Sequence, residues 1–383
     1  MTSRQTNDAS EAKPEKVRNK DEPAESAVER FEIEAVTDQA EDWQSLMERG
    51  KRNQPLQRIR NALLVLQNAP DLKGIQLRFN EFLMKREISG QPWRSFISNQ
   101  QVSDLDLDYL IYHSEIYGLT NKGVMESAVN ILCDKHSYHP VKDLLESLPA
   151  WDEKTDYITK VFVMYLGCED SDYTTEVGKL MFAGIINRIY QPGCKFDYCV
   201  VFVDPLQGGG KSTMCRFFAM NDDWYTTLSA FRDDQKLAEA ITGRLVVELD
   251  ELVALSRVRD VEAVKSFLSK AKETYRVPYD KYAQNIYRGS ICIGTTNDVS
   301  FLPNDRTGNR RFIPLRCDKT KQVMHPLENE SQTRKDIMKA YAQAKALYDR
   351  GELPTVLPKK IADMVEEKSK IGRAVQQECR DRS

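Results

Sequence analysis

Apolar residues recur at helical spacing through much of the first half of the chain. Residues 61–66 open an amphipathic stretch, Ser103 stands where a helix N-cap is expected, and residues 122–135 repeat the helical pattern. The pattern continues over residues 151–190, where one predicted face carries Ile158, Val161, Phe162, Tyr165 and Leu166. We therefore predict a mainly helical domain over residues 53–150, followed by the leading helices of a second domain.

Three short, continuous apolar runs follow, at residues 198–203, 245–247 and 290–294. Such runs are typical of strands that are buried on both faces. Because helical patterns lie between them, the sequence predicts an α/β core with a mainly parallel sheet over residues 151–330. Residues 331–383 are charged and helical in pattern, and form a predicted C-terminal tail. Residues 1–52 are polar, acidic on balance and poor in aromatics, which predicts a disordered arm.

A glycine-rich turn joins the first apolar run to a helical pattern. Backbone N–H groups of such a turn can cradle phosphates, and the helix N-terminus adds a favourable dipole. Lys211 is expected to reach the β- and γ-phosphates of ATP, and the Ser212 hydroxyl to ligate Mg²⁺. Pro205 stands where the usual P-loop pattern has its first glycine, so the loop entrance is expected to differ. The alternative is a glycine-rich surface turn. The predicted nucleotide-binding residues are Gln207, Gly208, Gly209, Gly210, Lys211, Ser212 and Thr213.

Acidic residues end the second apolar run. Hydrolysis of ATP needs one carboxylate to hold magnesium and another group to orient the attacking water. In extended geometry Glu248 and Asp250 face one side of the strand and Glu251 faces the other. The sequence leaves open which acid binds Mg²⁺ and which acts as the base. The alternative is a solvated acidic turn.

Polar and basic residues follow the third apolar run. We expect Asn297 to contact the γ-phosphate and the attacking water, the alternative being an asparagine that only closes a turn. Residues 304–312 carry Arg306, Arg310 and Arg311. An arginine that enters a neighbouring subunit's site would stabilise the transition-state charge. Salt bridges at the surface are the alternative.

Composition limits the choice of partners. The 383 residues are 41% hydrophobic and 30% charged, with a formal net charge of −3. Any nucleic-acid site must therefore be a local basic patch or the lining of an assembled pore. The sequence has neither a secretion signal nor an apolar run of about 18 residues, which predicts a cytoplasmic protein without a membrane partner. The eight cysteines lack a C-x-x-C pair and are expected to be reduced, mostly buried thiols.

The motifs together resemble the virulence-associated protein E family of bacterial prophages and mobile islands. The resemblance covers residues 56–317 and includes residues 79–82, 139–141, 148–152, 191–197, 247–252, 275–279, 294–297 and 308–312, besides the P-loop. That family is similar to superfamily 3 helicases, which have an AAA+ ATPase core. By this resemblance Lys211 and Ser212 match the Walker A pair, Glu248 and Glu251 the Walker B acids, and Asn297 the polar sensor. Arg310 or Arg311 matches the arginine finger.

The resemblance also implies a DNA-contacting element between the acidic strand and the sensor. This segment contains Lys270, Lys272, Tyr275, Arg276, Tyr279, Lys281, Tyr282 and Arg288. Basic groups neutralise phosphates and aromatic rings stack on bases, which suits a single strand. We expect Lys272, Arg276, Tyr279, Lys281 and Tyr282 to contact DNA. The alternative is a packed turn with solvated lysines.

These features predict an ATP- and Mg²⁺-dependent DNA helicase or translocase that helps to replicate a phage or mobile element in a bacterial host. The resemblance implies hydrolysis at intersubunit sites of a ring, expected to be a hexamer, with single-stranded DNA in the pore. A separate primase or other replication protein is a further expected partner. One alternative is an ATP-driven regulator that remodels proteins without unwinding DNA. Another is a non-hydrolysing scaffold with a relic P-loop.

Overall fold

The computed structural model describes residues 42–93, 100–229, 231, 234–250, 258–275, 284–298 and 309–367. The chain divides into two compact units, residues 1–46 and 47–383. In the first unit, residues 42–46 are described, and they contain the short 3-10 helix η1 (Trp43–Leu46). Most of the predicted arm therefore lies outside the described residues. Within the described ranges, no helix combines the length and apolar character needed to cross a membrane.

The second unit begins with three helices and a small sheet. The helices are α1 (Ile59–Asn68), α2 (Asp104–Ser114) and α3 (Lys122–Lys135), with short 3-10 turns η2 (Pro70–Leu72) and η3 (Glu115–Tyr117). Ser103 caps α2 as expected. Its hydroxyl accepts from the Asp106 backbone N–H, and the Asp106 carboxylate accepts from the Ser103 backbone N–H. The sheet has the order β2-β1-β3 and consists of β1 (Gln76–Asn80), β2 (Lys85–Ser89) and β3 (Ser137–Tyr138).

The helices of this region confirm the sequence pattern, whereas the sheet was not predicted. Strands β1 and β2 are five residues each and read QLRFN and KREIS. So few apolar positions give no clear two-residue alternation. The antiparallel pairing of the two strands supplies the regularity instead, with Leu77 opposite Ile88. The region therefore combines the expected helices with a small sheet.

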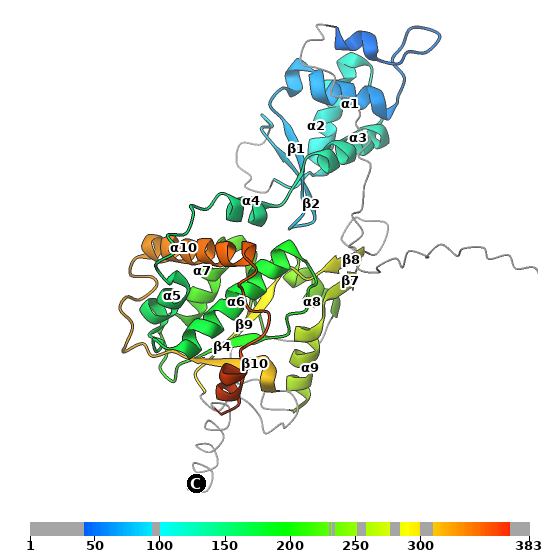
Figure 1. Cartoon of the computed structure of the whole chain (residues 1–383). Coiled ribbons are helices and arrows are strands. Elements are labelled where there is room, and N and C mark those ends of the chain that lie inside the picture. Colours follow the sequence, from blue (N-terminus) through cyan, green and yellow to red (C-terminus); the bar gives the residue numbers. More distant parts are fainter. Residues whose placement is uncertain are drawn as a thin grey trace, which may run out of the picture. The chain divides into compact units, whose positions relative to one another are not determined.

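A five-stranded parallel sheet forms the core of the second unit (Figure 1). The predicted strands are present as β4 (Cys199–Val203), β6 (Val246–Leu249) and β9 (Ile291–Thr296). Strand β10 (Phe312–Arg316) forms one edge and β5 (Tyr225–Leu228) the other, in the order β10-β4-β9-β6-β5. All pairings are parallel, which confirms the predicted α/β class. The carboxyl ends of all five strands consequently lie at the same end of the sheet.

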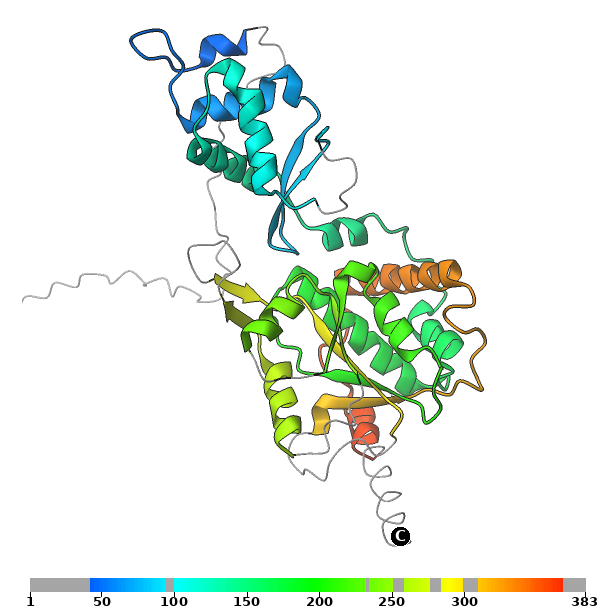
Figure 2. The ribbon, with the colours of Figure 1, turned by 180° about the vertical axis from the view of Figure 1, so that it is seen from behind.

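Helices cover both faces of this sheet (Figures 1 and 2). Val200 and Phe202 of β4 face a core shared with α5 (Tyr157–Leu166), α6 (Asp172–Tyr190) and α7 (Lys211–Phe218). Cys199, Val201 and Val203 face the other side, toward α8 (Asp234–Ile241) and α9 (Val258–Ser269). Strand side chains alternate between faces, so both sets are buried and β4 appears as one continuous apolar run.

Helix α10 (Glu330–Asp349) belongs to the same core, where it packs against α5 and α6. The Tyr341 hydroxyl donates to the Phe218 carbonyl, and the Tyr165 hydroxyl donates to the Asp336 carboxylate at 2.8 Å. The helix that opens the predicted tail is therefore an integral part of the α/β layers. Residues 47–383 form one compact unit, and the domain boundaries suggested at residues 150 and 330 remain predictions.

Candidate nucleotide-binding site

A glycine-rich loop, residues 204–210, connects β4 to α7. The backbone is left-handed at Gly208, with φ 76°, and at Gly210, with φ 75°. Both positions suit glycine, because a side chain is strained in this region. Gly209 is confined by its surroundings, since an added Cβ would lie 3.0 Å from the Asp204 Oδ2 atom. The loop thus obtains its sharp turns at residues 208 and 210, and Pro205 does not have to supply one.

Lys211 opens α7 and is 9% exposed. Its Nζ atom donates to Asn297 Oδ1 at 2.7 Å and lies 3.4 Å from the Asp204 carbonyl oxygen. Asn297 follows β9 directly, and β9 pairs with β4. Two residues that are 86 positions apart in the sequence therefore meet where adjacent parallel strands end. Ser212 is exposed and Thr213 half-buried on the first turn of α7.

Glu248 and Asp250 differ sharply in their surroundings. Glu248, on β6, is 1% exposed, and its Oε1 atom accepts from the Thr295 hydroxyl at 2.7 Å. Its Oε2 atom accepts from the Tyr225 hydroxyl, whose pKa is raised by burial and by this carboxylate. Asp250 lies exposed in the turn after β6. Both Glu248 oxygens thus have close protein donors, whereas Asp250 is exposed and its Oδ1 atom lies 3.5 Å from the same Thr295 hydroxyl. Glu251 lies outside the described residues.

Sequence reasoning missed several residues that shape this site. Asp204 follows β4 and is 1% exposed, and its carboxylate accepts from the backbone N–H of Leu206 at 2.9 Å and of Lys319 at 3.1 Å. Its place directly after a buried strand was the available signal. Tyr225 lies on a short, polar strand, and no local pattern points from it to an acid 23 positions away.

The two candidate arginine-finger residues lie at the amino ends of the strands, whereas the glycine-rich loop lies at the carboxyl ends. Arg310 and Arg311 belong to η6 (Asn309–Arg311), immediately before β10. Strand β10 pairs with β4 so that Phe312 lies opposite Cys199 and Arg316 opposite Val203. A five-residue strand spans roughly 15 Å, so these arginines and the glycine-rich loop are on different rims. Arg311 forms an ion pair with Asp197 at 3.3 Å, whereas Arg310 is exposed. Arg306 lies outside the described residues.

The predicted DNA-contacting segment contains an antiparallel hairpin of β7 (Lys272–Tyr275) and β8 (Gln284–Tyr287). Lys272 is exposed at its base. Arg276, Tyr279, Lys281 and Tyr282 lie outside the described residues. Arg288 is 3% exposed, pairs with Glu273 and stacks 4.3 Å above the Phe267 ring. Arg288 thus anchors the hairpin and is not available to a nucleic acid.

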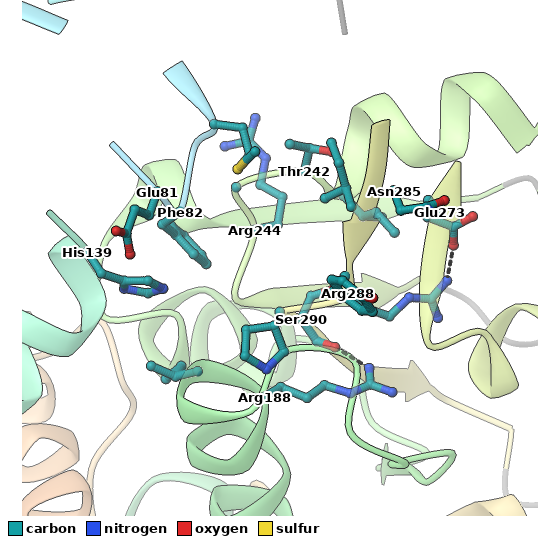
Figure 3. Close-up of a pocket in the computed structure, with 18 of the residues that line it drawn as sticks. Glu81, Phe82, His139, Arg188, Thr242, Arg244, Glu273, Asn285, Arg288 and Ser290 are labelled. Carbon is teal, nitrogen blue, oxygen red and sulfur yellow. Dashed lines mark hydrogen bonds and ion pairs between the residues drawn. The ribbon is translucent and has the colours of Figure 1, made fainter. Parts of the chain in front are cut away.

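A cavity of about 260 Å³ lies beside this hairpin (Figure 3). Phe82 and His139 line one side, and Arg188, Arg288 and Ser290 line the other. Burial, together with the Arg288 charge, lowers the pKa of Arg188 to about 10. The Arg188 guanidinium donates to the carbonyls of Ser290 and Phe196. No residue of the glycine-rich loop lines this cavity, so it is separate from the candidate nucleotide site.

The family model of the virulence-associated protein E-like domain matches residues 145–373. The chain belongs to this family. The match confirms the resemblance seen in the sequence, although it begins later than residue 56 and extends beyond residue 317. It contains every candidate nucleotide-site residue and leaves out α1, α2 and α3.

Comparison of the virulence-associated protein E-like chain with solved structures finds weak similarities. The A-form apo structure of the NrS-1 C-terminal region is 17% identical with a TM-score of 0.46, covering 77% of this chain and 72% of that one. The JCV helicase is 12% identical with a TM-score of 0.31, covering 69% of this chain and 78% of that one. No curated protein matches the sequence.

Proposed function

We propose that this chain is an ATP- and Mg²⁺-dependent DNA helicase or translocase that acts in replication of a phage or mobile element in the bacterial cytoplasm. The observation that carries the proposal is the 2.7 Å contact between Lys211 Nζ and Asn297 Oδ1, beside the acids that end β6. A glycine-rich loop alone would indicate only a site that binds an anion. The carboxyl ends of adjacent strands here carry a lysine, a polar amide and carboxylates. This combination suits hydrolysis of a nucleoside triphosphate.

The residues present fit ATP and magnesium. Gly208, Gly209 and Gly210 leave the loop backbone free of side chains, and α7 directs its N-terminus at the same place. Lys211 would bind the β- and γ-phosphates. Ser212 and Asp250, both exposed, are the oxygen donors that suit Mg²⁺. Bound magnesium would neutralise charge on the phosphates.

The remaining acids would act on the attacking water. Glu248 is held by hydroxyls from both neighbouring strands, which fixes the direction of its carboxylate. Glu251 is the next acid along the chain and lies outside the described residues. We keep both as candidates for the base, with Asn297 as the group that contacts the γ-phosphate.

The position of the arginines supports a site shared between subunits. Arg310 lies at the amino end of β10 and Lys211 beyond the carboxyl end of β4, so one chain does not bring the two together. In a closed ring, a head-to-tail interface can bring one subunit's arginine to the next subunit's nucleotide. We propose a homohexamer of this kind, with Arg310 as the finger because Arg311 is paired with Asp197.

Single-stranded DNA is the proposed polymer in the pore. The hairpin carries Lys272, and the sequence between its two strands contains Arg276, Tyr279, Lys281 and Tyr282, which lie outside the described residues. Basic and aromatic groups on one short element suit a phosphate backbone with exposed bases. A separate primase or another replication protein is the proposed protein partner.

The test is ATP hydrolysis by the purified chain with and without a single-stranded oligonucleotide. We expect hydrolysis that DNA stimulates, and a loss of about 100-fold or more in Lys211→Ala, because a preorganised charge in the site is removed. Lys321→Ala is the matched control, since Lys321 is an exposed lysine that pairs only locally with Asp318. Hydrolysis that is indifferent to DNA would count against the helicase and favour a protein-remodelling ATPase.

A further inference from the structure

The segment between β10 and α10 lies along the glycine-rich loop, and we call residues 318–326 the strap. Two of its side chains donate to loop carbonyls. Lys319 Nζ donates to the Gln207 oxygen at 2.8 Å, and Gln322 Nε2 donates to the Gly209 oxygen at 2.6 Å. These contacts join residues that are more than 110 positions apart, and no pattern in the sequence indicates them.

The strap is itself held by the end of α5. Gln322 Nε2 also donates to the Tyr165 oxygen at 2.9 Å. The backbone N–H of Val323 donates to the Met164 oxygen at 3.0 Å, and that of Asp318 to the Leu166 oxygen at 3.0 Å. Helix α5 is part of the main core. Lys319 and Gln322 therefore connect the glycine-rich loop to α5, a helix of the main core.

The strap also restricts the space around the loop. A Cβ added to Gly210 would lie 2.7 Å from Pro326 Cγ and 3.2 Å from His325 Nε2. A Cβ added to Gly209 would lie 3.4 Å from the Lys319 Cβ. The backbone of the loop is thus in close contact with the strap from residue 209 to residue 210.

Peptide geometry gives these hydrogen bonds a consequence. A peptide unit is planar and trans, so its carbonyl and its N–H point in opposite directions. A donor fixed on the Gly209 oxygen turns the Gly210 N–H away from Gln322, and a donor on the Gln207 oxygen turns the Gly208 N–H away from Lys319. Those two N–H groups belong to the loop that would cradle phosphate. Glycine has little intrinsic preference for one orientation, so an external anchor is needed.

We propose that Gln322 and Lys319 are positioning residues that preset the amide donors of the phosphate cradle. The inference rests on the proposed nucleotide site and adds the means by which its donors are oriented before the ligand arrives. Gln322 is uncharged, so its effect on an anion acts through the loop and not through charge. Preset donors cost no reorganisation on binding, which raises affinity.

The test compares binding of MgADP and steady-state ATP hydrolysis in Gln322→Met, Lys319→Ala and Lys319→Arg. Methionine keeps the length of Gln322 without its donors, and Lys321→Ala is the control on the same strap. We expect Gln322→Met and Lys319→Ala each to raise the Kd for ADP and the KM for ATP about tenfold, with kcat within about twofold. Such a split is the signature of an interaction made equally in the ground and transition states. Lys319→Arg, which keeps a donor, should recover the wild-type constants.

The result that overturns the inference is wild-type affinity for ADP in both Gln322→Met and Lys319→Ala while Lys211→Ala loses binding. In that case the nucleotide site stands and the strap does not position it. A wild-type chain that binds neither ADP nor ATP would instead remove the proposed function itself. If Gln322→Met fails to fold, the exposed Lys319 still allows the same comparison.

Discussion

At Glu248, hydroxyl donors from the strands on either side meet one buried carboxylate. Thr295 comes from β9 and Tyr225 from β5, so three adjacent strands contribute to a single hydrogen-bonded group. A buried acceptor that loses its donor is left without water to replace it. The orientation of this acid therefore depends on single atoms of its neighbours.

Replacing Tyr225 by Phe tests this dependence. The change removes one hydroxyl and leaves Glu248 Oε2 unsatisfied in the interior, so the free energy of unfolding should fall by about 1–3 kcal/mol. Urea denaturation followed by circular dichroism measures it. Tyr157→Phe is the matched control, because the Tyr157 hydroxyl donates to Asp152 at the surface, where water can replace it. Equal losses in the two variants would contradict the role given to the Glu248 contact.

A second residue-level prediction separates backbone strain from ligand binding. Gly208 and Gly351 both have positive φ, 76° and 68°, and an added Cβ meets nothing within 4 Å at either. Alanine at each should therefore reduce the free energy of unfolding by a similar amount, about 1–2 kcal/mol. Only Gly208→Ala should weaken binding of MgADP, measured by titration calorimetry. Unchanged affinity in Gly208→Ala would argue against residue 208 as part of the cradle.

At the scale of elements, helix α4 (Pro140–Glu146) links the small sheet to the main core. His139 caps it, since its Nδ1 atom accepts from the Lys142 backbone N–H at 3.2 Å. The His139 ring also lies 5.5 Å from the Phe82 ring, at the tip of the β1–β2 hairpin. Burial is the main cause that lowers the pKa of His139 below its usual 6.5. A protonated ring could not accept the capping bond at that nitrogen.

This cap predicts a pH dependence of stability. Because the folded-state pKa is lowered, the unfolded chain binds the proton more readily, and the contribution of His139 is complete above about pH 6.5 and lost as pH falls through the folded-state value. The melting temperature should therefore drop between pH 7.5 and pH 5.5. In His139→Asn, which keeps a capping acceptor without titrating, this drop should be smaller. A drop of the same size in both proteins would assign it to other groups.

At the scale of the whole molecule, the parallel sheet places the glycine-rich loop and Arg310 at opposite ends of its strands. Lys211, Asn297 and Asp250 follow the carboxyl ends of their strands, whereas Arg310 precedes the amino end of β10. Under the proposed function, one chain thus offers two halves of a site that face different directions. A ring of identical chains would unite them at each interface.

Mixing two inactive variants tests this arrangement. We expect Arg310→Ala to bind MgADP normally but to hydrolyse ATP at least about 1,000-fold more slowly, because a transition-state charge is lost. Lys211→Ala should fail to bind. A mixture of the two should recover part of the activity, since some interfaces then combine an intact loop with an intact arginine. A mixture as inactive as its components would contradict a shared site. Arg311→Ala is the comparison, expected to lose mainly its ion pair with Asp197.

The sequence alone determined the features that depend on neighbouring residues. Buried parallel strands produce continuous apolar runs, so β4, β6 and β9 were predicted. The glycine-rich loop, the acids after β6 and Asn297 were found because each follows such a run directly. Helix α3 was predicted at its observed bounds, and Ser103 was recognised as a cap, because both depend on local spacing.

Only the tertiary structure decided which distant groups meet. Strand order places β9 between β4 and β6, and this brings Asn297 to Lys211 and Thr295 to Glu248. The same order distinguishes Glu248, which is buried between two hydroxyl groups, from Asp250, which is exposed. The sequence does not show this difference, because both residues are acidic. Gln322 and Lys319 reach the loop only because β10 pairs beside β4 and the strap then turns back. Local pattern reports burial and turns, whereas contacts across a sheet follow from the order of its strands.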